Sequence, residues 1–280
     1  MKILVDELEL EQAKITRDIW YTYTKKIKKP SKTYLSKRAV SNTKNLVITD
    51  LSRMHDDRVC IFGIDEDGNP IRPVLPYPGI REHHLFDKNG NLFIKPFSMV
   101  KFNFIRPRPD PPHTEDFILD SSLKPSFVEN LTDYKAKRLL DIILDDSVDE
   151  IFGTEIHNNR YTEANKGERS LGTIKAVDVP YIKYGEKLNG KYEYRIEFSD
   201  NAGGTYNLPI TDCAFRNYCD KKRIEKHKNP NLIAAQLQSE LNKNKPYLRV
   251  GLTRLFQGVN WLQISGLYTF PDYRNKLLLQ

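Results

Sequence analysis

The sequence predicts a mainly β protein with a few helices, built as two small β-barrels in tandem and preceded by a basic N-terminal arm. Short segments that alternate apolar and polar residues recur on both sides of one helical segment. Positive charge is concentrated in a single stretch near the N-terminus. The length of 280 residues leaves room for two small domains.

Composition excludes several classes of protein. Hydrophobic residues make up 39% and aromatic residues 11% of the chain, which suffices for a core and argues against disorder. No apolar run approaches the ~18 residues that span a bilayer. The three cysteines include no CxxC pair, which argues against a disulfide scaffold or a cysteine-rich zinc site. Acids interrupt the first residues, where a signal peptide is apolar. We therefore expect a soluble protein without a membrane partner, in a reducing compartment such as the cytoplasm.

The basic arm carries the net charge of the chain. Residues 21–45 hold eight lysines and arginines and no acid, whereas the whole chain has 44 basic and 37 acidic residues. The other 255 residues therefore sum to −1, since +7 minus +8 is −1. Such a segment attracts polyanions, although a solubilising linker or a nuclear-import signal would have the same composition. We assign nucleic-acid binding in this arm to Lys25, Lys26, Lys28, Lys29, Lys32, Lys37 and Arg38.

Residues 1–44 form an N-terminal extension, which includes nearly all of this basic segment. Within it, residues 8–20 predict a short helix, because Leu8, Ile15, Ile19 and Trp20 are loosely periodic. Pro30 prevents such a helix from continuing through the basic segment.

The first barrel is predicted over residues 45–128. Residues 45–52 are typical of a strand, and residues 58–75 of two strands joined by a turn at Asp67-Gly68-Asn69. Residues 96–108 predict a further strand, in which apolar Val100 and Phe102 alternate with polar residues. A proline-rich loop follows and resists sheet pairing.

A connecting helix is predicted within residues 129–150, where Leu139, Leu140, Ile143 and Leu144 form an apolar stripe. The second barrel is predicted over residues 151–280, with an inserted helix near 230–243 and two strands at the end. Residues 191–198 alternate strictly between polar and apolar, which indicates a sheet with one buried face. About five strands per module is the size of a barrel of the OB or SH3-like kind, with a β-sandwich as the alternative.

A family resemblance is carried by three stretches: LSRMHDDRVCIFGID to IRPVLP over 51–76, PFSMVKFNFIRPRPDPPHTEDF over 96–117, and RVGLTRLFQGVNWLQISGLYTFPDY over 249–273. Together they resemble the prokaryotic dual OB-fold domain family, which is often linked with conflict or defence loci. The resemblance spans about residues 45–275. It implies two OB-like barrels and a nucleic-acid or nucleotide-binding role, and it implies no residue roles.

Four residues of the first barrel are candidates for nucleic-acid contact, because OB barrels bind nucleic acid on their early β-strands and the adjoining loops. They are Arg53, His55, Arg58 and Arg72. The alternative is a set of salt bridges with the nearby acids Asp56, Asp57 and Asp65.

Two loops of the second half add Arg160 in HNNRY and Arg169 in NKGERSLG. Glycines flank Arg169 and would let a phosphate approach closely, but the Walker spacing is absent, so no NTP hydrolysis is implied. An ordinary turn is the alternative for both loops.

In YLRVGLTRLF, alternation places Arg254 on the same face of the predicted strand as Leu248, Val250 and Leu252, which is unusual for a charged residue. Either a bulge at Gly251 resets the register, or an acid such as Asp272 pairs with the arginine.

The leading hypothesis is a non-catalytic protein that binds nucleic acid, with single-stranded DNA or RNA expected, as a sensor or targeting subunit beside an effector protein in a prokaryotic defence system. No catalytic residue, metal or cofactor is predicted. One alternative is a metal-dependent nuclease that uses His83, His84, His113, Glu115 and Asp116. The other is a protein-interaction subunit of a larger complex.

Overall fold

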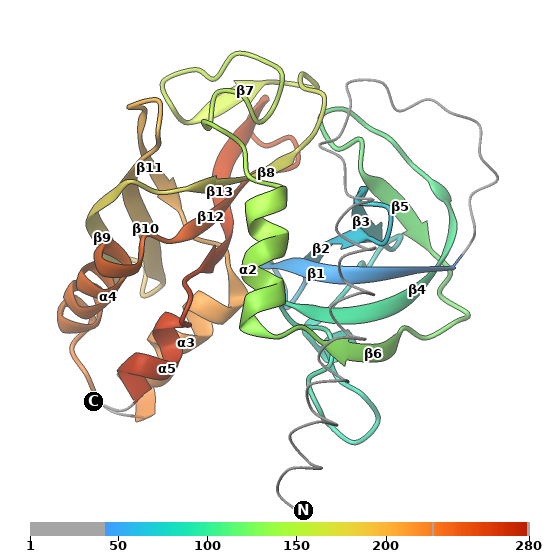
Figure 1. The fold of residues 1–280 in the computed structure, drawn as a ribbon, viewed down its shortest axis with the longest axis horizontal. Coiled ribbons are helices and arrows are strands. Elements are labelled where there is room, and N and C mark those ends of the chain that lie inside the picture. The colour runs from blue at the N-terminus through green and yellow to red at the C-terminus, as the bar shows by residue number, and fades with distance from the viewer. Residues whose placement is uncertain (1–42, 226, 279–280) are drawn as a thin grey trace, which may run out of the picture.

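The computed structural model describes residues 43–225 and 227–278, which form two β modules with helix α2 (Asp133–Ile142) between them (Figure 1). The basic residues predicted at 25–38 and the helix predicted at 8–20 lie outside the described residues. None of the helices in the described part is long and apolar enough to cross a membrane.

The first module is a closed five-stranded barrel. Its strands follow the order β1-β2-β3-β5-β4, and pairing of β4 with β1 closes the ring. The β3–β5 pair is parallel and the others are antiparallel. A further strand, β6, pairs with β4 beside β5. The strands are β1 (Thr43–Arg53), β2 (Val59–Asp65), β3 (Pro70–Val74), β4 (Ser98–Pro107), β5 (Asp116–Leu119) and β6 (Ser126–Asn130).

Alternation along the strands builds the core of the first barrel. Val100, Phe102 and Phe104 of β4 are buried while Lys101 is exposed, as their spacing predicts. Gly63 on β2 is required by close packing, because a Cβ there would lie 2.8 Å from the carbonyl oxygen of Val47.

Helix α2 lies within residues 129–150, where the connecting helix is predicted. The hydroxyl of Thr132 accepts a hydrogen bond from the backbone N–H of Lys135 and caps the first turn. Leu139 and Leu140 are fully buried, so the apolar stripe packs between the modules.

The second module repeats the strand order of the first with gaps. Strands β8 and β9 occupy the place of one long first strand, and the order becomes β11-β10-β9 in one sheet and β8-β12-β13-β7 in the other. Only one parallel bridge, Ile210 with Ile264, joins the edges of β11 and β13, so the module is a half-barrel. The strands are β7 (Tyr161–Glu163), β8 (Leu171–Lys175), β9 (Asp178–Glu186), β10 (Tyr192–Ser199), β11 (Thr205–Pro209), β12 (Tyr247–Leu252) and β13 (Val259–Tyr268). The predicted mainly β fold with tandem OB-like modules is confirmed.

Two helices between β11 and β12 complete the core of the second module. Helix α4 (Pro230–Asn244) lies at the predicted place, with Asn229 as its N-cap and Leu237 and Leu241 buried. Helix α3 (Cys213–Glu225) was not predicted from the sequence, because polar residues separate its few buried side chains. A last helix, α5 (Tyr273–Leu278), follows β13.

Candidate nucleic-acid interface

The second barrel covers the outer surface of β2 and β3 of the first barrel. Arg72 of β3 is only 6% exposed, and its Nε donates to Oδ1 of Asp116 at 2.5 Å. Arg254, from the loop between β12 and β13, donates to the other oxygen of Asp116. Asp116 therefore holds one arginine from each barrel, and Arg72 is enclosed at the junction.

A second ion pair joins the barrels through their strands. Arg249 of β12 donates from Nε to Oδ2 of Asp50 in β1 at 3.0 Å, and both side chains are buried. Ser265 donates to Oδ1 of the same carboxylate at 2.6 Å. The Arg249 guanidinium also lies 5.2 Å from the ring centroid of Phe62 on β2.

The loop before β5 adds further buried polar contacts. The hydroxyl of Ser170 donates to Glu115, and a ring nitrogen of His113 lies 3.2 Å from the carbonyl oxygen of Thr253. Burial lowers the pKa of His113 to about 2, and nearby Arg72 adds to this shift. Burial raises the pKa of Glu115, although Arg72 opposes the shift. The lowered pKa favours the neutral form of His113, and Glu115 is held at the junction by its hydrogen bond from Ser170.

The residues proposed for a metal-dependent nuclease are not assembled into a metal site. His113, Glu115 and Asp116 are buried at the junction, whereas His83 and His84 lie on η1 (Glu82–Leu85). Among the described residues, no group of three His, Cys, Asp or Glu side chains is placed to hold a metal ion.

Arg53 at the end of β1 and Arg58 just before β2 are paired with protein groups, whereas His55 in the turn between them is exposed. Arg53 donates to Asn217 of α3 at 2.6 Å and lies 3.4 Å from Glu82. Arg58 lies 3.9 Å from Asp56 and donates to the carbonyl oxygen of His55 at 3.1 Å.

The other predicted ion pairs differ from expectation. Asp57 pairs with Arg81 at 2.7 Å, and Asp65 pairs with Lys44 at 2.6 Å. Arg254 pairs with Asp116 in place of the suggested Asp272, and the bulge lies between Arg249 and Val250 rather than at Gly251. The partners come from other elements, which local sequence cannot indicate.

The two arginines predicted in the second half have different surroundings. Arg169 donates to Asp145 at 2.6 Å and to the carbonyl oxygen of Ile151, so it braces the loop after α2. The side chain of Arg160 is exposed, and its carbonyl oxygen accepts from the N–H of Leu262 at 2.8 Å. Of these two arginines, Arg160 is the one available to a ligand.

The second barrel presents an open counterpart of the surface that is covered in the first. Strands β10 and β11 occupy the places of β2 and β3, and Arg195 of β10 lies on their outer side. Its Nε donates to Oδ1 of Asn207 on β11 at 2.7 Å. Burial lowers the pKa of Arg195, the charge of Glu193 opposes this shift, and the charge of Arg160 adds to it. Tyr181 of β9 is 49% exposed on the same face, opposite Glu197.

Aromatic rings continue this surface across the seam between β11 and β13. Tyr161 lies 5.5 Å from His157 and 5.3 Å from Trp261, measured between ring centroids. The side chain of Asn159 donates to the carbonyl oxygen of Thr205 in β11 at 3.0 Å, which holds the loop at the seam. We call the surface formed by Tyr181, Arg195, Asn207, Arg160, Tyr161 and Trp261 the second-barrel face. Of this set, only Arg160 is predicted from the sequence, although the alternation in β10 indicates the outward position of Arg195.

Acidic residues on β10 offset part of the positive charge of the second-barrel face. Glu193 lies 2.6 Å from Lys183 and 3.5 Å from Lys187, and the side chains of both lysines are about half exposed. Glu197 accepts from the side chain of Asn207 at 3.1 Å. Strong attraction to a polyanion therefore requires charge from elsewhere in the chain.

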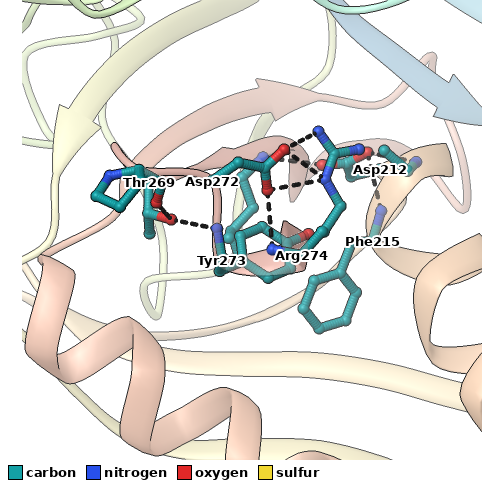
Figure 2. Close-up of polar contacts among 9 residues, drawn as sticks. Asp212, Phe215, Thr269, Asp272, Tyr273 and Arg274 are labelled. Atoms are coloured by element: carbon teal, nitrogen blue, oxygen red, sulfur yellow. Dashed lines mark hydrogen bonds and ion pairs between the residues drawn. The ribbon is translucent and has the colours of Figure 1, made fainter. Parts of the chain in front are cut away.

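The carboxyl group of Asp212 is enclosed at the start of α3 (Figure 2). It accepts from the backbone N–H groups of Ala214 and Phe215 and from that of Leu267 in β13. Burial raises its pKa to about 6, although Arg274 opposes the shift. Figure 2 also shows Arg274 paired with Asp272, at 2.6 Å between Nη2 and Oδ2. Asp212 is fully buried, so its role is to join α3 to β13.

Comparisons with known proteins give a family model and a distantly similar solved structure. No curated protein matches the chain. A solved structure described as the tetrameric p202 HIN2 is similar over 79% of this chain and 91% of its own, with 8% sequence identity and a TM-score of 0.26. The model of the dual OB-containing domain family matches residues 44–267, which run from β1 of the first barrel into β13 of the second, and the chain belongs to that family.

Proposed function

We propose that the protein binds single-stranded nucleic acid on the second-barrel face and that the basic arm supplies most of the electrostatic attraction. OB barrels bind oligonucleotides on the surface of their second and third strands and on adjoining loops. In the first barrel this surface is covered by Arg254 and its neighbours, whereas in the second barrel it is open. This contrast is the observation that carries the proposal.

The second-barrel face has the groups that unpaired nucleotides require. Arg160 and Arg195 offer guanidinium donors to phosphate, and Arg side chains also stack on bases. Tyr181, Tyr161 and Trp261 offer ring surfaces for stacking, which tolerates any base sequence. Because Glu193 and Glu197 offset part of its positive charge, the face is expected to contribute mainly through stacking.

The arm and the face contribute different kinds of binding energy. Contacts between lysine and phosphate release counterions, so each one lost lowers the slope of log affinity against log salt by about 0.7 for single strands. Loss of one stacked base costs about 1–3 kcal/mol and leaves that slope nearly unchanged.

Fluorescence anisotropy of the full chain with labelled single-stranded DNA, single-stranded RNA and duplex DNA tests the proposal. Trp261→Ala is expected to weaken single-strand binding roughly 5- to 150-fold, the equivalent of one stacked base. Arg160→Glu is expected to weaken it too, whereas Lys221→Glu, the same charge change on exposed α3, is expected to have little effect. Equal losses from Arg160→Glu and Lys221→Glu would refute the assignment to this face.

A second comparison isolates the arm. Alanine at the seven basic residues between Lys25 and Arg38 is expected to reduce the salt dependence and keep the preference for single strands. A variant that loses all binding would show that the arm alone binds nucleic acid. The proposed sensor or targeting role beside an effector protein rests on the family resemblance, and the free cysteines Cys60, Cys213 and Cys219 suit the proposed cytoplasmic location.

A further inference from the structure

The first barrel has a pocket of about 850 Å³ that opens onto its interior. Ile61 of β2, Phe102 of β4 and Leu119 of β5 line it, and all three belong to the barrel core. Around them, Phe86, Leu92, Leu123 and Phe127 line the same pocket and are 43–51% exposed. An apolar surface this large and this connected to a core is typical of a binding site.

The second barrel shows what occupies the corresponding place there. Between its third and fourth strands, β11 and β12, the chain forms α3 and α4. Buried Phe215, Leu237 and Leu241 of these helices pack in one cluster with the strands of that barrel. Between β3 and β4 of the first barrel, the described chain has only the four-residue η1 (Glu82–Leu85) (Figure 1). The first barrel therefore lacks the helical cover that completes the second.

We propose that the N-terminal segment of this same chain, residues 8–20, docks in the pocket as an amphipathic helix. The segment has the required apolar side, because Leu8, Ile15 and Ile19 are spaced by seven and four residues and share one helical face. Trp20 follows directly and supplies a large ring at the edge of that face.

The chain enters the described part of the structure at the pocket. Thr43 begins β1, and its hydroxyl lies 2.7 Å from Oδ1 of Asn103, which itself lines the pocket. The 22 residues between Trp20 and Thr43 span up to roughly 70 Å when extended, so the connection does not limit docking. A segment tethered in this way binds at high effective concentration.

Charge on the two surfaces is complementary. Lys88, Lys95 and Lys124 line the pocket, and within the described part of the chain none of them forms a salt bridge. The two acids that line it, Asp87 and Asp120, each accept hydrogen bonds from neighbouring residues.

The docking segment supplies the opposite charge. Residues 1–20 contain five acids and three bases, a net charge of −2 since 3 minus 5 is −2. Glu9, Glu11 and Asp18 lie within the proposed helix. Docking would anchor the basic residues 25–38 at both ends, as a loop beside the first barrel.

Tryptophan fluorescence of the full chain tests the proposal. The chain has two tryptophans, so Trp261→Phe leaves Trp20 as the reporter. In this background we expect blue-shifted emission from Trp20 and protection from acrylamide. Phe127→Glu and Leu123→Glu change exposed residues of the pocket and are expected to shift the emission to the red and remove the protection.

Leu232→Glu is the matched control, because Leu232 is 62% exposed on α4 of the other barrel. It is expected to leave the emission of Trp20 unchanged. In the Trp261→Phe background, emission of Trp20 typical of a solvent-exposed tryptophan would overturn the proposal. Protection from acrylamide that survives both pocket variants would also overturn it. Protection that is lost on dilution, with a dimeric mass by light scattering, would assign the pocket to a second copy and would also overturn it.

Discussion

Arg249 and Asp50 form a buried ion pair between the two barrels, at 3.0 Å between Nε and Oδ2 and 199 residues apart in the sequence. Ser265 and Thr173 hydrogen bond to the same pair, so most of its polar atoms have partners. The pair thereby fixes the position of β12 against β1. The relative placement of the barrels depends on such contacts, because a buried charge tolerates few alternative positions.

Arg249→Ala is expected to reduce the free energy of unfolding by about 3–5 kcal/mol, because Asp50 would remain buried without its counter-charge. Urea unfolding followed by circular dichroism measures this loss. Arg81→Ala is the control: it removes an ion pair with Asp57 in which both side chains are at least one-third exposed, and should cost at most about 1 kcal/mol. Equal losses in the two variants would contradict a dominant role for burial.

His113 is expected to make the junction sensitive to acid. Its folded-state pKa of about 2 lies below the ordinary value of 6.5, so the unfolded chain binds the extra proton between these values. The contribution of His113 to the free energy of unfolding is therefore complete above pH 6.5. Below pH 6.5 this contribution falls by up to about 1.4 kcal/mol per pH unit.

His113→Gln tests this dependence, since the glutamine amide can still donate to the carbonyl oxygen of Thr253. Unfolding free energies at pH 7.5, 6.5 and 5.5, taken as the difference between wild type and variant, should fall as the pH falls. A difference that stays constant over this range would show that His113 is protonated equally in both states.

Asp212 is expected to act in the opposite direction. Its folded-state pKa of about 6 lies above the ordinary value of 3.8, so the folded chain holds the extra proton between these values. The contribution of Asp212 to the free energy of unfolding is complete below pH 3.8. It is lost as the pH rises through 6, by up to about 1.4 kcal/mol per pH unit. The stability of wild type relative to Asp212→Asn should therefore decrease from pH 4 to pH 6.5, measured by urea unfolding. An increase over that range would contradict the raised pKa.

Gly63→Ala is expected to destabilise the first barrel by about 1–3 kcal/mol, because its Cβ would press against the backbone of Val47. Thermal unfolding provides the measurement. Gly185→Ala in β9 is the matched control, since no atom lies within 4 Å of a Cβ there. It should change stability by at most about 1 kcal/mol. If both variants behaved alike, close packing at Gly63 would not be the reason for the glycine.

The fold could be predicted where local pattern and burial coincide. The alternation of Val100 and Phe102 with polar neighbours identified β4, and the turn before Asn69 identified the hairpin of β2 and β3. Helix α3 was missed because Phe215 and Cys219 stand among charged residues, and its burial comes from packing against both barrels.

The candidate site was predicted less well than the fold. Arg72 alternates with apolar residues as a surface residue would, and no local pattern distinguishes a side chain that faces water from one that faces a second barrel. The loop at Asn159 contacts β11 next to the ring pair of Tyr161 and Trp261, and no local pattern in the sequence indicates this contact between distant segments.

The sequence by itself determined two β modules, the helix between them and the concentration of positive charge in one arm, because periodicity, turn residues and charge are local properties. Only the tertiary structure decided which OB surface is open. Asp116 lies among acids and prolines in the sequence, yet its two arginine partners come from different barrels, and this pairing encloses Arg72 on the surface of the first barrel. Contacts between residues far apart in the chain depend on how the barrels pack, which no local pattern specifies.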